Sequence, residues 1–173
     1  MLGKIPPWTG ATTTVKYPLI HVIETTLETG TGSVVVKPVG LAVWNVSVLT
    51  KATGMDPAEK ERRDADKKRC EAFFGKGGQR SKIYFAKWAS QQVKLATLVV
   101  HPGFRLPGGG TMLVRWGMAV AENNGWPVIL CASPMGRVLY KHLGFEEIAS
   151  EVVQVEGEEE TLTSTVMVWG AGE

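Results

Sequence analysis

The chain has 173 residues, of which 44% are hydrophobic and 21% charged, as in an ordinary single globular domain. Its formal charge of +2 is too small to favour nucleic acid or an anionic membrane as a partner. Cys70 and Cys131 are the two cysteines, so a disulfide framework is excluded, and no Cys/His pattern suggests zinc. We therefore expect one domain over 1–173 without a metal, in the cytoplasm or, as the alternative, the nucleus.

The first half of the chain predicts a hairpin followed by an insertion. Residues 1–18 are rich in Pro and Thr and form an irregular N-terminal segment. Residues 19–27 and 34–44 are rich in β-branched residues and read as two strands, with Pro38 and Gly40 indicating a bulge or bend in the second. Residues 45–92 form a charged helical insertion with Asp56 as its predicted N-cap. Acidic residues are interleaved with its basic ones, which favours a solvated helix over a basic binding patch.

The second half, residues 93–169, has stronger signals. A strand over 95–100 is followed by a glycine-rich loop over 103–110 and a helix over 112–124 with Gly125 at its end. A buried strand over 128–132 precedes a short helix, which Ser133 caps and Pro134 begins. Strands over 145–155 and 161–169 complete the order β-β-(α insertion)-β-α-β-α-β-β. This order predicts an α/β (α+β) domain with a mixed, mostly antiparallel sheet flanked by helices.

The glycine-rich loop is the candidate phosphate site. It contains Arg105 and three successive glycines directly before a helix, where unpaired N–H groups and a partial positive charge favour anions. Gly109-Gly110-Thr111 lacks the lysine of the P-loop signature. The next strand ends at Ala132-Ser133 rather than at the acidic residue of a dinucleotide site. Both of these familiar phosphate loops are therefore disfavoured.

A third interpretation accounts for two motifs together. Val100-His101-Pro102 with Arg105-x-x-Gly108-x-Gly110 resembles the acetyl-CoA loop of the GNAT superfamily of N-acetyltransferases. Downstream, Ala132-Ser133-Pro134 and Leu139-Tyr140 with Leu143-Gly144-Phe145 resemble the family's later strand, helix and "LY..LGF" motif. Residues 95–145 are most similar to fungal GNAT proteins of unassigned substrate, and residues 39–44 resemble the family's third strand.

The resemblance implies a role for each matching residue. The backbone of Leu98, Val99 and Val100 would pair with the pantetheine arm, and Ser133 would touch it. Tyr140 would lie near the thioester sulfur as general acid for the departing thiolate. The loop residues would hold the pyrophosphate: Arg105, Leu106, Gly108, Gly109, Gly110 and Thr111.

Several features depart from the family pattern. Pro107 cannot donate a backbone hydrogen bond, and Leu106 stands where a basic residue is common. The strand and helices that normally precede the first hairpin are not evident in residues 1–18. We therefore expect either an N-terminally shortened form or an acceptor pocket built in another way. Glu24, His21 and His101 are candidate general bases, and the sequence does not choose among them.

The sequence thus predicts an acetyl-CoA-dependent N-acetyltransferase that transfers an acetyl group to an amine by direct attack on the thioester. The acceptor amine is left open, and a homodimer is compatible with the sequence. We expect neither a nucleic-acid nor a membrane partner. The alternative hypothesis is a non-catalytic or degenerate CoA-binding or interaction protein on the same scaffold.

Overall fold

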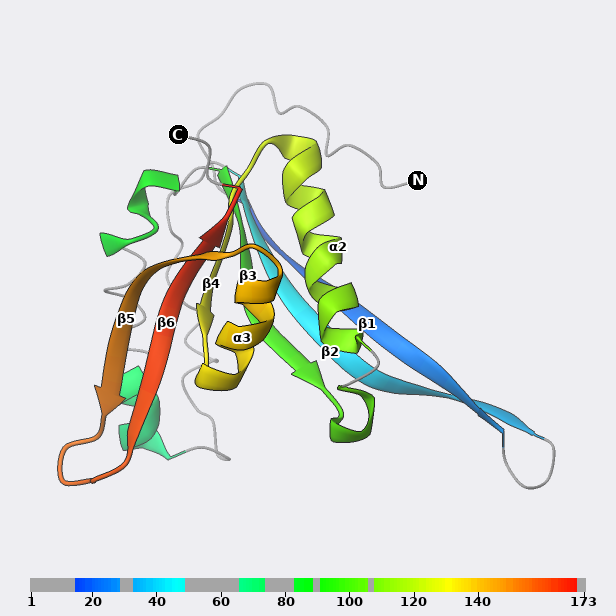
Figure 1. Ribbon diagram of the computed structural model, residues 1–173, viewed down its shortest axis with the longest axis horizontal. Helices are drawn as coiled ribbons and strands as arrows, with labels where there is room; N and C mark the ends of the chain where they lie inside the picture. Colours follow the sequence, from blue (N-terminus) through cyan, green and yellow to red (C-terminus); the bar gives the residue numbers. More distant parts are fainter. Residues whose placement is uncertain are drawn as a thin grey trace.

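A computed structural model describes residues 15–28, 33–48, 66–73, 83–88, 91–105 and 108–170. Its centre is a six-stranded sheet in the order β1-β2-β3-β4-β6-β5. β3 and β4 are parallel, and the other neighbouring pairs are antiparallel (Figure 1). The strands are β1 Val15–Glu28, β2 Val34–Val48, β3 Gln91–Val100, β4 Val128–Ala132, β5 Glu146–Gln154 and β6 Thr161–Trp169.

The β1–β2 hairpin is long and contains the predicted irregularity. Ile23 pairs with Gly40 and Glu24 with Pro38, so Val39 is an extra residue at a bulge. A Cβ atom at position 40 would lie 3.0 Å from Cγ1 of Ile23 and 3.1 Å from the carbonyl oxygen of Val99. Glycine therefore lets three strands approach one another at this bend. Beyond it, the hairpin projects past the end of β3 as a two-stranded arm (Figure 1).

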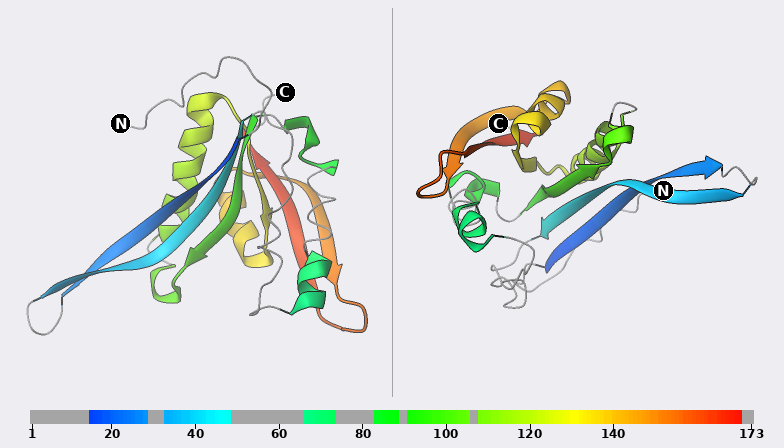
Figure 2. Two further views of the ribbon diagram at one scale, coloured as in Figure 1. Left: turned by 180° about the vertical axis from the view of Figure 1, so that it is seen from behind. Right: turned by 90° about the horizontal axis from the view of Figure 1, so that it is seen from below.

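Two helices cover one face of the sheet. Figure 2 shows that α2 (Gly109–Asn124) and α3 (Pro134–His142) lie on the same side. α2 packs over β1, β2 and β3, and α3 packs over β4 and β6. Gly125 ends α2 in the left-handed conformation at φ 67°. Ser133 caps α3, because its hydroxyl oxygen accepts from the N–H of Gly136 at 3.2 Å.

Trp44 packs in the core between α2 and the sheet. Its indole is fully buried and lies directly against the backbone of α2 at Gly117, where an added Cβ would come within 2.3 Å of the ring. Trp116 on the same helix stacks on His21 of β1, with ring centroids 4.6 Å apart. The mid-helix glycine therefore serves close packing, which decides how near α2 sits to the sheet.

The opposite face is covered only in part by the described residues. Phe85, with Tyr84 and Trp88 beside it, packs on Ile129, Val166 and Val168 over β4 and β6. A short helix at residues 67–73 lies on this side, by the turn between β5 and β6 (Figure 2). The larger part of the sheet face formed by β1 and β2 has no described helix over it.

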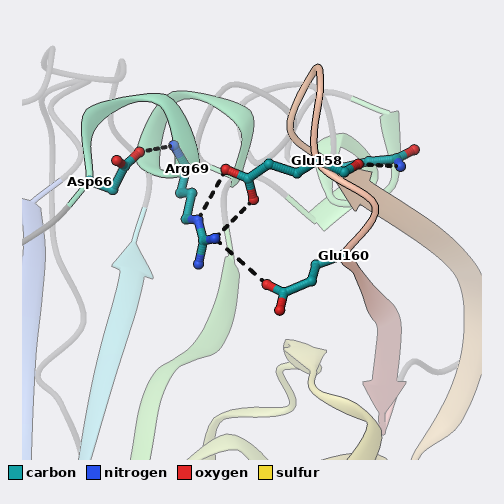
Figure 3. A network of polar contacts seen from close by, with 5 residues as sticks. Asp66, Arg69, Glu158 and Glu160 are labelled. Atoms are coloured by element: carbon teal, nitrogen blue, oxygen red, sulfur yellow. Dashed lines mark hydrogen bonds and ion pairs between the residues drawn. The ribbon is translucent and has the colours of Figure 1, made fainter.

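Polar contacts connect the short helix to the β5–β6 turn (Figure 3). Arg69 Nη2 lies 3.0 Å from Glu158 Oε2 and 3.6 Å from Glu160 Oε2. Asp66 caps the helix by accepting from the N–H of Arg69 at 2.9 Å. Arg69 and Glu160 are exposed and Glu158 is half-buried, so these ion pairs add little to the stability of the fold. This arrangement agrees with a solvated helix.

The predicted fold class and element order are confirmed. The hairpin, the bulge, the caps at Ser133 and Gly125, and strand 161–169 are all present. The helix start predicted at Asp56 lies outside the described residues. β1 begins at Val15, so the last four residues of the segment predicted to be irregular, 15–18, are strand. β2 continues to Val48 and β3 begins at Gln91, so strand residues occupy both ends of the predicted insertion. α2 begins at Gly109 rather than Met112, which places two glycines inside the helix.

Substituting Gly117 tests the packing of α2 on Trp44. We expect Gly117→Ala to lower the free energy of unfolding by about 2 kcal/mol or more in urea denaturation, because the methyl group must displace a buried indole. Arg115→Ala, on the exposed face of the same helix, is the matched control and should change it by less than about 0.5 kcal/mol. Trp44→Leu combined with Gly117→Ala should cost less than the two changes added together. Additive losses would contradict direct contact.

Candidate active site

The candidate site begins where β3 and β4 separate. The two strands pair in parallel over only three residues, from Val93↔Val128 to Leu95↔Leu130. β3 continues for five more residues beyond this pairing, and β4 for two. Figure 1 shows the two strands starting side by side and then pointing apart. This leaves an edge of β3 without a neighbouring strand among the described residues, on the side facing β4.

Successive residues of β3 point their backbone N–H and C=O groups to opposite sides of the strand, and this determines which groups face the gap. The N–H of His101 donates to the carbonyl of Val39 on β2 at 2.7 Å. In an antiparallel ladder, the amide and carbonyl of a residue point the same way and successive residues alternate. The backbone groups of Val99 therefore face Leu41 of β2, whereas those of Leu98 and Val100 face the gap. Of the three predicted backbone contacts, Val99 is directed away from it.

Arg105 and the amino end of α2 lie at the end of the same strand. The Nε atom of Arg105 donates to the carbonyl of Val100 at 3.2 Å, which holds the guanidinium beside the last residue of β3. Gly108 precedes α2 with φ 87°, and Met112 makes the first helical bond by donating to the Gly108 carbonyl. The N–H groups of Gly109, Gly110 and Thr111 thus belong to the first turn and have no carbonyl within the helix to bond.

Two of the three glycines at this helix end, Gly109 and Gly110, leave room for close neighbours. A Cβ at position 109 would lie 2.8 Å from Cδ1 of Ile23, and one at position 110 would lie 3.2 Å from Cδ2 of Leu139. At position 108, by contrast, an added Cβ meets nothing within 4 Å. No acidic side chain lies in the first turn of α2, so its partial positive charge is not offset there. The residues present fit an anionic phosphate group.

α3 places the motif that contains Leu139 and Tyr140 beside the glycine-rich loop. Leu139 on α3 reaches Gly110 at the start of α2, so the two segments singled out in the sequence lie side by side. Ser133 is exposed at the amino end of α3, and its hydroxyl oxygen already accepts one bond as a cap. Its proton can still be donated to a ligand.

Tyr140 lies on the inner face of α3. Its side chain is 6% exposed, and its ring lies 5.6 Å from that of Phe145 between centroids. A Cβ at position 136 would approach Cε2 of Tyr140 to 3.0 Å, so Gly136 makes room for this ring. Burial raises the pKa of Tyr140 to about 12. The phenol is therefore neutral at physiological pH and retains a proton to donate.

An ion-pair group attaches α3 to β5. The Arg137 guanidinium contacts both carboxylate oxygens of Glu147, with Nε–Oε1 at 2.6 Å and Nη2–Oε2 at 2.9 Å. Lys141 Nζ lies 3.2 Å from the same Oε1 atom. The hydrogen bond from Arg137 is the main cause that lowers the pKa of Glu147. This bidentate geometry restricts rotation of the helix that carries Tyr140.

The three candidate general bases occupy different positions. His21 is stacked on Trp116 in the layer between β1 and α2, and Glu24 is exposed on the hairpin. Nδ1 of His101 accepts from the N–H of Gly103 at 3.2 Å, so in the neutral ring the hydrogen is on Nε2 and the one free lone pair is engaged in this bond. None of the contacts described above joins His21, Glu24 or His101 to Tyr140. Over the described ranges, no cluster of three or more His, Cys, Asp or Glu side chains is arranged to hold a metal ion.

Most of the predicted site residues that the structure describes lie in one region. Tyr140 lies on the adjoining α3, and Ser133 is the cap that precedes this helix. The others lie at the end of β3 or at the amino end of α2: Leu98, Val100, Arg105, Gly108, Gly109, Gly110 and Thr111. Leu106 and Pro107 lie outside the described residues. Sequence reasoning missed Gly136, Leu139 and Ile23 as neighbours of the site. A glycine inside a nine-residue helix was the available signal for Gly136.

Comparison with solved structures identifies the architecture. An agmatine N-acetyltransferase matches 79% of this chain and 72% of its own length, with a TM-score of 0.55 at 12% identity. A polyamine N-acetyltransferase of Drosophila melanogaster matches 79% of this chain and 73% of its own, with a TM-score of 0.55 at 13% identity. The chain has the GNAT fold. A putative arylalkylamine N-acetyltransferase of the yellow fever mosquito matches 77% of this chain and 59% of its own, at a TM-score of 0.53 and 15% identity.

Sequence comparison points the same way over a shorter stretch. A protein of the fungus Stachybotrys chartarum, named acetyltransferase, is 33% identical over 73 residues, which is 42% of this chain. The match spans 32% of the relative's length. No family model matches the chain. The predicted resemblance to GNAT proteins is confirmed at the level of the fold.

The buried phenol makes a testable prediction about pH. Because the pKa of Tyr140 is raised from 10.0 to about 12, the neutral form is favoured in the folded protein. Its contribution to stability is complete below pH 10 and is lost as the pH rises from about 10 to about 12. Phenolate absorbance of the wild type minus that of Tyr140→Phe should therefore titrate near pH 12, with circular dichroism confirming that both remain folded. Titration near pH 10 in a folded protein would contradict the burial.

Proposed function

We propose that this chain is an acetyl-CoA-dependent N-acetyltransferase of the GNAT type. The observation that carries the proposal is the separation of β3 from β4 directly beside the glycine-bearing amino end of α2. An extended pantetheine arm fits a strand edge that has no partner, and a pyrophosphate fits the adjoining helix end. The GNAT fold supports the same assignment.

The binding residues divide by the chemistry they offer. The amides of Gly109, Gly110 and Thr111, with the Arg105 guanidinium, would hold the pyrophosphate. The gap-facing backbone of Leu98 and Val100 would pair with the pantetheine, and the carbonyl of Val100 is already taken by Arg105. Ser133 would donate to the pantetheine from the other side.

Catalysis would consist of positioning and proton transfer. When bound, acetyl-CoA supplies an acetyl thioester, and an amine attacks its carbonyl carbon as the carbon–sulfur bond breaks. The N–H groups of Leu98 and Val100 are the strand donors available to hold the carbonyl oxygen. Tyr140 would protonate the departing thiolate, a role that suits a phenol kept neutral by burial. The acceptor amine loses its own proton to a base outside these contacts or to water.

A matched pair of glycine substitutions tests the phosphate site. Gly108 and Gly125 lie at opposite ends of α2, both with positive φ and both with open space where a Cβ would be. Gly108→Glu should abolish calorimetric binding of acetyl-CoA, because its carboxylate is placed at the predicted pyrophosphate position. Gly125→Glu also places a side chain at a positive φ and should bind as tightly as wild type. Equal affinity in the two variants would place the phosphates elsewhere.

Tyr140→Phe tests the proton donor. We expect kcat to fall about 10²-fold or more while the Kd for acetyl-CoA changes by less than about twofold, because the hydroxyl acts only on the leaving thiolate. Initial rates from release of free thiol, together with calorimetry, give both quantities. Unchanged kcat would assign the donor role to another group.

A further inference from the structure

We propose that His101 is a positioning residue for cosubstrate binding, because its side chain holds the tight turn that brings Arg105 back to the end of β3. The inference rests on the proposed function, since it takes the Arg105 guanidinium to bind the pyrophosphate. It also gives one of the three candidate general bases a different role, in binding rather than in proton transfer.

One short turn connects β3 to Arg105. Pro102–Phe104 form a single turn of 3₁₀ helix directly after His101. The N–H of Phe104 donates to the carbonyl of His101 at 2.8 Å, which closes this turn. Arg105 follows at once, and its Nε atom donates to the carbonyl of Val100 at 3.2 Å. The direction of the guanidinium therefore depends on the shape of the turn.

The side chain of His101 caps this turn. Its Nδ1 atom accepts from the N–H of Gly103 at 3.2 Å, and an N–H so near the start of a helical turn has no carbonyl within the turn to bond. Its ring also meets Phe104 edge to face, with centroids 5.7 Å apart. The backbone of His101 is held separately, because its N–H donates to the carbonyl of Val39 at 2.7 Å. A substitution at this position therefore removes the cap and leaves the end of the strand ladder in place.

Arg105 gains from being held in this way. It is exposed, and ordering such a long side chain on a ligand costs conformational entropy. The bond to Val100 uses only the Nε–H group, which leaves the N–H groups of both Nη atoms for phosphate oxygens. Within the described ranges, no carboxylate forms an ion pair with this guanidinium. A cation that is already ordered binds an anion with a smaller loss of entropy.

The same hydrogen bond argues against His101 as the general base. In a neutral imidazole one nitrogen accepts, and here that nitrogen is Nδ1, which is engaged with Gly103. Taking a proton from the amine would place a hydrogen on Nδ1 and break the cap. Proton transfer at this ring would thus disturb the turn that holds Arg105, whereas the positioning role uses the ring as it stands.

Two substitutions separate the hydrogen bond of His101 from its ring. His101→Asn keeps a side-chain oxygen that can accept at a cap, whereas His101→Phe keeps an aromatic ring beside Phe104 and has no acceptor. By calorimetry, we expect the Kd for acetyl-CoA to stay within about twofold of wild type in the Asn variant and to weaken about fivefold in the Phe variant, as for a lost cap. His142→Ala removes an exposed histidine of α3 and is the control, which should bind as wild type does.

A double-mutant cycle shows whether His101 acts through Arg105. Arg105→Ala should weaken binding about tenfold or more, because a hydrogen bond to a charged group is lost. Adding His101→Phe to it should then weaken binding no further. Additive losses, or an Asn variant as weak as the Phe variant, would overturn the proposal. A residue that acts only as a base would leave the Kd unchanged in both His101 variants, which would overturn it as well.

Hydrogen exchange of the Arg105 Nε–H group, followed by NMR, needs no cosubstrate. Exchange should be faster in His101→Phe than in wild type and unchanged in His101→Asn, with circular dichroism confirming that both variants are folded. Equal exchange in all three proteins would contradict the proposal. Failure of the proposed function is a different result: the folded wild type then does not bind acetyl-CoA. That result would also exclude a role for His101 in such binding, while the exchange rate still decides whether His101 orders Arg105.

Discussion

The direct packing of the Trp44 indole on the backbone of α2 is the contact on which the rest of the structure depends. Because Gly117 has no side chain, the helix can approach β2 closely enough to bury a whole indole between them. That approach sets the height and direction of α2 over the sheet. Its amino end then lies by the end of β3, where Ile23 and Val100 contact its first glycines.

The two strands that separate, β3 and β4, are joined by this same helix. A parallel pair must be joined by a crossover, and here α2 is that crossover. β4 turns toward β6 and pairs with it along its whole length, while β3 follows β2. The result, among the described residues, is an edge of β3 inside the sheet that has no neighbouring strand, where the carbonyl of Val100 accepts from Arg105. Such an edge suits an extended ligand without exposing the whole sheet to aggregation.

The groups used in the proposed reaction lie on the face of the sheet that α2 and α3 cover. On the α2 and α3 face lie the helix amides, Arg105 and the neutral phenol of Tyr140, which together suit an anionic cosubstrate and its leaving group. On the opposite face, Ile20, Val22 and Val99 are exposed. Among the described helices, none is long and apolar enough to span a membrane.

The sequence by itself determined the elements and the chemistry of the loops. β-branched runs, the Ser133-Pro134 cap and the glycines at positions 108–110 and 125 predict local structure because they act over a few residues, through backbone sterics and capping bonds. The family resemblance over 95–145 indicated the fold. Sequence did not show that α2 begins at Gly109, since glycine is a poor helix former and here is retained for contacts with Ile23 and Leu139. Only the tertiary structure decided that Val99 turns its backbone toward β2, that Tyr140 is buried, and that Ile20 and Val22 are exposed. Strand register and helix packing set these features through contacts between residues far apart in the chain, and no local pattern encodes them.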